Sequence, residues 1–205
     1  MEVTYIFDKE LSLKEKLPLL NVPLNKNGKL LKAPGPPGKY IEEDYVSISG
    51  LEYKKQVKWL QKIVGLAIYI AHKYRYDILY YVNVIALNTL FPNKEVKELA
   101  RLLVQYLWDT KEKKLIWYKK KNNENQIMLN AIADASFAKQ KEFKSQLGYY
   151  IKIDDNIIAG KSTKSKTTLT STAEAEIGAI GLSIPVWKHI QLLLKELSTD
   201  KIITT

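Results

Sequence analysis

Acidic side chains at two places in the sequence could act together on a metal ion. Asp134 directly follows the apolar run 127–133, and Glu174 and Glu176 open an apolar, helix-like segment about forty residues later. Carboxylates that converge can hold two divalent ions about 4 Å apart, so that one ion activates water and the other stabilises the leaving oxygen of a phosphoryl group. The alternative is that Asp134 only ends a strand and that the glutamates only favour a helix N-terminus.

The two glutamates have different positions relative to the start of the expected helix. Ser171 and Glu174 have the spacing of a capping box, which turns the acid back toward the helix start. Glu176 has no such role, and it lies one residue before Ile177, at the border of the apolar stripe. Glu176 is therefore free for other contacts and could reach the end of the strand that carries Asp134.

The composition excludes several other kinds of chemistry. The 205 residues include no cysteine and two isolated histidines, His72 and His189. Disulfides, thiolate zinc sites and cysteine nucleophiles are therefore excluded, and a histidine-based metal site or a Ser-His-Asp triad is disfavoured. Any bound metal should have oxygen ligands, which suits Mg²⁺ or Mn²⁺.

A lysine-rich stretch contains a partial phosphate-loop motif. Gly160-Lys161-Ser162 matches the end of that motif, but the motif requires a second glycine where Asp155 stands, so the phosphate-loop interpretation is rejected. Two interpretations of Lys161, Lys164 and Lys166 stay open: a phosphate-facing basic edge and an ordinary solvated one.

The charge balance suggests a polyanionic partner. Thirty-two basic residues against 22 acidic ones give a formal net charge of +10, with tyrosines and tryptophans interspersed. Lysines that contact phosphates and aromatic rings that stack on bases would suit nucleic acid. The alternative is that most of these tyrosines are half-buried packing residues in an ordinary basic protein.

The first 125 residues should form an arm, three helices and a short strand. Residues 1–50 hold five of the seven prolines, which favours an extended arm. Apolar spacing of three and four predicts a helix over 52–74, a second apolar helix over 78–90, and a third that begins at Asn93 as N-cap. A short strand is expected at 115–118 and a linker at 121–125.

The remainder of the chain should form a sheet with one long helix. Strands are predicted at 127–133, 147–153, 156–159 and 166–170, followed by a helix over 172–197 that is kinked or restarted at Pro185. Residues 202–205 resemble the first half of another strand. The expected class is thus α+β, a helical bundle followed by a mixed sheet with one packed helix.

No uninterrupted apolar window is long enough for a membrane span, and the N-terminus lacks the features of a signal peptide. We therefore expect a cytoplasmic or nuclear protein that is not secreted and has no membrane partner.

Several motifs, taken in chain order, resemble one continuous piece of the Pol polyprotein of Ty/copia-type LTR retrotransposons of yeasts. The most specific are Lys-Ser-Gln-x-Gly at 144–148, Gly-Lys-Ser-Thr-Lys at 160–164 and Thr-Ala-Glu-Ala-Glu at 172–176. The resemblance runs from about residue 10 to the C-terminus. Its other parts are at 17–25, 33–35, 80–83, 90–92, 115–117 and 133–136.

This resemblance implies a domain order. Residues 1–50 would be an extended arm from the end of a reverse transcriptase, residues 51–121 a thumb or connection-like helical segment, and residues 122–205 a truncated ribonuclease H-like domain. The family's first catalytic Asp falls on Asp134 and its helix Glu on Glu176, so the resemblance implies that these two are the catalytic and metal-binding residues. Ser136 of the same Asp-Ala-Ser motif joins Lys161, Lys164 and Lys166 as an expected contact with nucleic acid.

Two departures from the family pattern shape the expected function. The polymerase palm would lie upstream of Met1, and the third ribonuclease H carboxylate would lie beyond Thr205, so we expect a remnant or truncated reading frame. The expected function is binding of RNA/DNA hybrid or duplex without the full catalytic set. The alternatives are an active metal-dependent ribonuclease H and a module that pairs with an intact Pol polyprotein.

Overall fold

The computed structural model describes residues 2–7, 10–24, 30–36, 50–119, 126–138, 143–197 and 201–204. The chain divides into two compact units. Residues 7–115 form a helical unit, and residues 1–6 together with 116–205 form a unit built on β-sheet. The class is α+β, as the sequence predicts.

The helical unit is built around three helices that the apolar spacing predicts. They are α2 (Leu51–Lys73), α3 (Leu79–Leu87), which follows the 3-10 turn η2 (Tyr76–Ile78), and α4 (Lys94–Asp109). Asn93 caps α4 as expected, because its side chain accepts a hydrogen bond of 2.8 Å from the backbone N–H of Val96. The core consists of side chains at helical spacing, among them Leu60, Ile63, Ile85, Val96 and Leu103.

The prediction that residues 1–50 form an extended arm is wrong for part of that stretch. Residues 10–16 form the helix α1 (Glu10–Lys16), and η1 (Pro18–Leu20) continues it as a 3-10 turn. No proline falls inside α1, and Leu13 and Leu17 are fully buried, so the helix has an apolar face to bury. The prolines determine the path of the chain only after α1.

Residues 30–36 follow the surface of the helical unit closely. The backbone carbonyl of Gly35 accepts a hydrogen bond of 2.9 Å from the Tyr81 hydroxyl, and the Leu31 N–H donates to the Asp109 carboxylate at 3.0 Å. A Cβ at Gly35 would lie 2.6 Å from a methyl carbon of Leu99, so glycine permits this close approach.

A buried polar network connects η2 to the end of α4. The Arg75 side chain, 3% exposed, donates two hydrogen bonds of 2.9 Å to the two carboxylate oxygens of Asp77. Its remaining N–H groups reach the carbonyl of Thr110 at 3.2 Å and the hydroxyl of Thr110 at 2.8 Å, and the Tyr106 hydroxyl donates to Asp77 at 2.8 Å.

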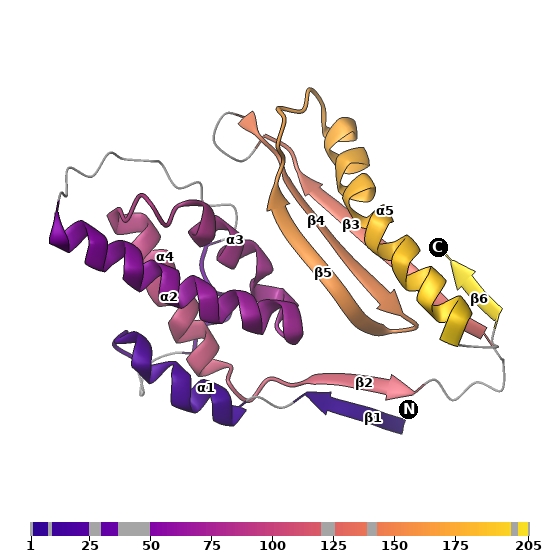
Figure 1. Ribbon diagram of the computed structural model, residues 1–205, viewed down its shortest axis with the longest axis horizontal. Coiled ribbons are helices and arrows are strands. Elements are labelled where there is room, and N and C mark those ends of the chain that lie inside the picture. The colour runs from indigo at the N-terminus through magenta and orange to yellow at the C-terminus, as the bar shows by residue number, and fades with distance from the viewer. Residues whose placement is uncertain are drawn as a thin grey trace. The chain divides into compact units, whose positions relative to one another are not determined.

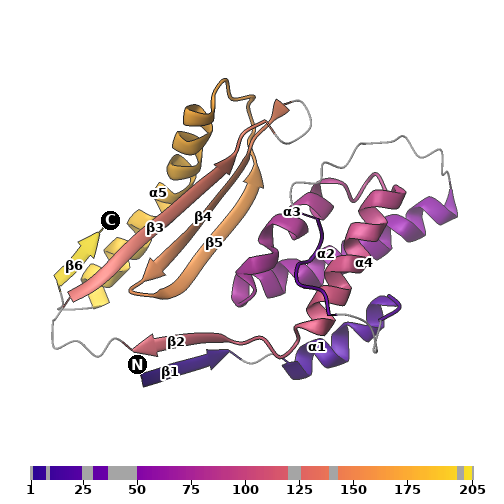
Figure 2. The same cartoon turned by 180° about the vertical axis from the view of Figure 1, so that it is seen from behind.

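The sheet unit contains two sheets (Figures 1 and 2). β1 (Glu2–Phe7) pairs with β2 (Leu115–Lys119), and the larger sheet has the order β5-β4-β3-β6. β3 (Gln126–Ser136), β4 (Gln146–Ile153) and β5 (Asn156–Lys164) are antiparallel, whereas β6 (Lys201–Thr204) lies parallel to β3. The two-residue turn between β4 and β5 places Asp154 at a φ of 52°.

One long helix covers one face of the larger sheet. α5 (Thr172–Leu197) packs one side against a core formed by Leu129 of β3 with Tyr149 and Ile151 of β4, whereas Ile177, Ile180 and Ile184 on another side of the helix are exposed. The helix residues in that contact are Leu182, Val186, Trp187, Ile190 and Leu194. α5 starts at the end of the sheet where β3 finishes (Figures 1 and 2).

Two local predictions differ from the structure. The strand expected at 166–170 is not formed. β5 instead extends through the polar residues up to Lys164. After it, the Ser165 hydroxyl donates a hydrogen bond of 2.7 Å to the carbonyl of Thr167 and closes a turn. Of the kink or restart expected at Pro185, the restart is wrong, because α5 continues through the proline as one helix. Because Leu182 and Val186, on either side of the proline, both pack on the sheet, both halves of the helix are held in place.

α5 is also long and apolar enough to cross a membrane, judged by length and composition alone. One such helix is weak evidence by itself: one side of α5 packs on the sheet, although only 11% of its most apolar stretch is buried.

Candidate nucleic-acid interface

Asp134 lies on the face of the larger sheet that α5 does not cover. Leu129 and Ala133 of β3 point into the core beneath α5, and residues of opposite parity therefore point to the other face. Asp134 is accordingly exposed, as is Ser136 two residues later. We refer to this side of the sheet as the open face.

Gly148 of β4 stands directly beside Asp134 on the open face, and Ser162 of β5 stands beside Gly148. The adjacent row consists of Ser136, Gln146 and Lys164. With no side chain at Gly148, Asp134 borders an unobstructed strip of sheet, which is the kind of surface that lets another backbone approach.

Glu176 lies in the first turns of α5, at the same end of the sheet as Asp134 (Figure 1). It is partly exposed and adjoins Ala175 and Ala179, which are buried against the sheet. Asp134 and Glu176 therefore share an end of the unit, with Asp134 on the open face and Glu176 on the helix that covers the opposite face.

The start of α5 confirms the different role predicted for Glu174. Its backbone N–H donates to the Ser171 hydroxyl at 3.1 Å, and its carboxylate accepts from the N–H and the hydroxyl of Thr170 at 2.6 and 2.8 Å. These hydrogen bonds hold the pKa of Glu174 below its usual value. Glu174 is thus engaged at the helix N-terminus, which leaves Glu176 as the acid available for other contacts.

The described acids do not fit a two-metal site. Among the described residues, no three Asp, Glu or His side chains come close enough together to hold a metal ion. Mg²⁺ retains its water ligands strongly, so that an exposed Asp134 with at most one further acid is a poor binding site for it. We therefore derive no chemical step through a metal.

The lysines predicted as a phosphate-facing edge do not share one face. β5 is an edge strand, and Lys164 lies on the open face in the row of Ser136. Lys161 pairs with Tyr149, whose ring is in the core, so it points to the other side of the sheet. Lys166 follows the end of β5 and is exposed. Of these three lysines, Lys164 alone therefore shares the open face with Asp134 and Ser136.

The serines of the two motifs at 144–148 and 160–164 and their neighbour Ser165 hold the sheet together. The side-chain amide of Gln146 donates a hydrogen bond of 2.8 Å to the Ser162 hydroxyl, and the backbone N–H of Ser145 donates one of 3.1 Å to the Ser165 hydroxyl. The backbone N–H of Ser165 in turn donates a hydrogen bond of 2.8 Å to the carbonyl of Ser145. These motifs therefore connect β4 to β5, a structural role that their spacing does not reveal.

Replacing Ser165 with alanine is expected to lower the free energy of unfolding by about 1–3 kcal/mol, because the buried N–H of Ser145 would lose its acceptor. Urea denaturation followed by circular dichroism measures this loss. Ser136→Ala is the matched control, since the Ser136 side chain is exposed and should be near neutral. An equal effect of both changes would contradict the role assigned to Ser165.

A basic surface lies on α2. Five lysines and one histidine stand on this helix against a single acid, Glu52. At 100° per residue, Lys54, Lys58, Lys62, Gly65, Tyr69, His72 and Lys73 fall on one exposed face. We call these seven residues the α2 basic face.

Two features make the α2 basic face suitable for a long polyanion. A Cβ at Gly65 would meet nothing within 4 Å, so a flat place opens between the lysines and Tyr69. Tyr69 is 49% exposed, and the Lys16 ammonium lies 6.0 Å from its ring centre. The apolar spacing in the sequence predicts the core stripe of α2 but does not single out these lysines. Their alignment on one helix face was the signal that could have identified them.

Comparison with known proteins reveals relatives among retrotransposon polyproteins. The chain is 48% identical over 194 residues to "Truncated transposon Ty1-A Gag-Pol polyprotein" of Saccharomyces cerevisiae, covering 95% of this chain and 16% of the relative. It is 47% identical over 194 residues to "Transposon Ty1-JR1 Gag-Pol polyprotein" and to "Transposon TyH3 Gag-Pol polyprotein" of the same species, covering 95% of this chain and 11% of each.

The chain thus spans about one sixth or less of the length of these relatives. No family model matches the chain. No solved structure matches it either.

Proposed function

The chain is a Ty-type retrotransposon Pol sequence that corresponds to one segment of the Ty1 Gag-Pol polyproteins, and from that premise we propose that it binds RNA/DNA hybrid or duplex nucleic acid. The observation that carries this proposal is the α2 basic face, where cations line one exposed side of a helix and no acid interrupts them. Phosphate contacts of this kind position a duplex without reading its sequence.

In this proposal the helical unit is the thumb or connection-like end of a reverse transcriptase. The helix α2 would lie along the backbone of the duplex, with its lysines spaced one turn apart. A turn of α-helix rises about 5.4 Å, close to the separation of successive phosphates, so that Lys54, Lys58 and Lys62 could follow one strand. Tyr69 would extend the contact at the far end of the row.

The sheet unit is, in the same proposal, the beginning of a ribonuclease H domain. A mixed sheet in which β6 runs parallel to β3 after a helix connection supports this interpretation. Asp134 and Glu176 would be its catalytic carboxylates, with Ser136 and Lys164 beside Asp134 on the open face as contacts to nucleic acid. Lys161 points to the other side of the sheet and Lys166 follows the end of β5, so these two lysines would add only long-range attraction to the binding of nucleic acid.

We expect the chain to bind hybrid without cutting it at a meaningful rate, because two carboxylates cannot hold a pair of Mg²⁺ or Mn²⁺ ions against their retained water. The measurement is cleavage of end-labelled RNA in an RNA/DNA hybrid with either metal added, in parallel with Asp134→Asn and Glu176→Gln. All three proteins should leave the RNA intact. Robust cleavage that either substitution abolishes would instead establish an active ribonuclease H with further acids in its site.

A second candidate function is pairing with an intact Pol polyprotein. The paired positions of β3 and β6 run from Gln126 to Leu129 of β3, whereas β3 itself continues to Ser136. The side of β3 beyond Leu129 could therefore accept a strand from another chain. Co-purification of the chain with a tagged Pol protein in nuclease-treated, high-salt buffer tests this possibility apart from binding to nucleic acid.

A further inference from the structure

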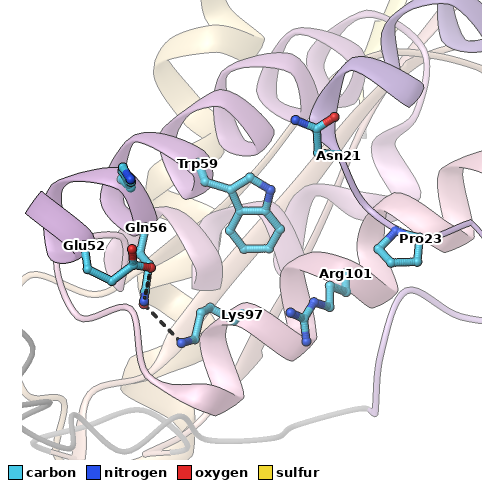
Figure 3. A pocket seen from close by; sticks show the side chains of 8 residues that line it. Asn21, Pro23, Glu52, Gln56, Trp59, Lys97 and Arg101 are labelled. Carbon is cyan, nitrogen blue, oxygen red and sulfur yellow. Dashed lines mark hydrogen bonds between the residues drawn. The ribbon is translucent and has the colours of Figure 1, made fainter.

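The helical unit contains a cavity of about 380 Å³ next to the α2 basic face, and Figure 3 shows side chains that line it. Three elements enclose it: the chain just after η1, the first turns of α2, and the middle of α4. The residues that line it are Asn21, Pro23, Glu52, Lys55, Gln56, Trp59, Lys97 and Arg101. Its volume falls in the range of small-molecule sites, about 300–1,000 Å³.

An aromatic ring forms one wall of the cavity. Figure 3 shows the indole of Trp59 projecting from α2 into the space that faces Lys97 and Arg101. Its Nε1 donates a hydrogen bond of 2.9 Å to the carbonyl of Leu20, which fixes the orientation of the ring. A partly exposed, fixed indole offers a planar surface on which another aromatic ring can stack.

Basic side chains form the opposite wall. Lys97 and Arg101 are one turn apart on α4, and Lys55 adds a third cation from α2, whereas Glu52 is the only acid in the lining. The Lys97 ammonium donates to Gln56 at 3.1 Å, and the Gln56 amide donates to Glu52 at 3.0 Å. Gln56 therefore separates the acid from the ammonium, so Lys97 is not neutralised by a direct ion pair.

Arg101 is also available for a ligand. Its nearest acid is Glu98, at 3.7 Å, and both side chains are more than half exposed (55% and 56%). Exposed ion pairs of this kind contribute little, so a phosphate that binds two N–H groups of the guanidinium can displace Glu98.

We propose that this cavity binds one unpaired nucleotide, with its base stacked on Trp59 and its phosphate between Lys97 and Arg101. Stacking on an aromatic side chain and phosphate contact to Arg or Lys are the two interactions that single-stranded nucleic acid uses most. Gln56 and Asn21 at the rim would offer amide groups to the base edge. An acidic peptide would use the cations but would leave the indole face without a partner.

The proposal goes beyond duplex binding, because it assigns unpaired nucleic acid to a cavity next to the α2 basic face that is proposed to hold the duplex. The same chemistry could come from a free nucleotide or from a single-stranded extension next to a duplex. Both sources present a base and a phosphate that belong to one nucleotide. The experiment therefore has one arm for the free nucleotide and one for the single-stranded extension.

The first arm titrates AMP, adenosine and ribose 5-phosphate into the full chain and follows tryptophan fluorescence and calorimetric heat. AMP should bind saturably, and adenosine and ribose 5-phosphate should each bind at least tenfold more weakly. Arg101→Gln and Lys97→Gln should each weaken AMP binding roughly three- to tenfold. Lys94→Gln removes a charge from an exposed position of α4 outside the cavity and should have no effect.

Trp59→Leu should abolish the AMP-dependent fluorescence change, and its circular dichroism spectrum must match that of the unmodified chain for the result to count. Should that variant misfold, the surface variants Lys97→Gln and Arg101→Gln still decide the matter. Absence of saturable AMP binding, equal losses with Lys94→Gln, or equally tight binding of an acidic peptide would overturn the proposal.

The second arm compares a blunt hybrid with the same hybrid carrying a short single-stranded extension. Tighter binding of the extended form, lost in Arg101→Gln, identifies an unpaired strand end as the occupant. AMP binding without such a gain supports the cavity and identifies a free nucleotide. Failure of the blunt hybrid to bind would count against the proposed duplex function while leaving the AMP result intact.

Discussion

Replacing Asp77 with alanine is expected to lower the free energy of unfolding of the helical unit by about 3–5 kcal/mol, because it leaves the guanidinium of Arg75 buried without a counter-charge. Arg75 is 3% exposed and donates to both carboxylate oxygens of Asp77. Asp77 also accepts from the Tyr106 hydroxyl, so the substitution removes three hydrogen bonds at once. Urea denaturation followed by circular dichroism measures the loss.

A double-mutant cycle measures the interaction free energy between Arg75 and Asp77 apart from the contacts that each makes with other residues. Arg75→Met should cost less than Asp77→Ala, since the Asp77 side chain is 39% exposed and water can solvate it. The combination of Arg75→Met with Asp77→Ala should be more stable than Asp77→Ala alone, because no unpaired charge remains buried. Additive losses would show that Arg75 and Asp77 do not interact as the geometry requires.

The same pair predicts how stability depends on pH. Burial by itself raises the pKa of Asp77, but hydrogen bonds from Arg75 and Tyr106 and the charge of Arg75 outweigh it and hold that pKa below its usual value. The stabilisation is therefore complete above the ordinary carboxyl pKa of about 4 and is lost as the pH falls through the lower, folded-state value. Asp77→Asn should remove this acid-dependent part of the stability curve.

Replacing Lys54, Lys58 and Lys62 together with glutamine is expected to weaken binding of RNA/DNA hybrid roughly one hundredfold at low salt. Each lost phosphate contact should also reduce the slope of log K against log salt by about 0.9, so the triple variant should bind with a slope shallower by about 2.7. Fluorescence anisotropy with a labelled hybrid provides both quantities. The lysines are exposed, so folding should be unchanged.

The matched control removes the same charge elsewhere. Lys32, Lys188 and Lys195 are also exposed, and none of them lies on α2. Their replacement with glutamine should change affinity by only a few fold through net charge. An equal loss in both triple variants would assign binding to overall charge and not to the α2 basic face.

Local signals in the sequence predicted the parts of the fold that depend on neighbouring residues. The periods of three and four predicted α2 and α4, Asn93 predicted the start of α4, and Ser171 with Glu174 predicted the start of α5. Each of these signals acts within one or two helical turns, where intrinsic preference and side-chain capping decide the conformation.

Features that join distant segments could not be predicted in this way. Arg75 and Asp77 meet Tyr106 across about thirty residues, and the cavity combines residues near positions 21, 56 and 101. The polar residues 160–164 showed no apolar alternation, yet they form most of β5 because pairing with β4 satisfies their backbone. The opposite orientations of Lys161 and Lys164 likewise depend on strand register, which the sequence did not specify.

The candidate acids illustrate both cases. The separate role of Glu174 followed from the capping-box spacing and is confirmed, whereas the placement of Asp134 on the open face follows only from which side of the sheet α5 covers. The catalytic pairing of Asp134 with Glu176 stays a prediction, and the cleavage assay with both variants addresses it.

The salt dependence of hybrid binding by the unmodified chain tests the central claim most directly. Anisotropy titrations of a labelled RNA/DNA hybrid in EDTA, from about 50 to about 200 mM salt, should show log K falling linearly with log salt. Four to six phosphate contacts would produce a slope of about −4 to −5. A flat salt response, or no binding at the lowest salt, would contradict the claim that this Pol sequence holds duplex nucleic acid through its basic surface.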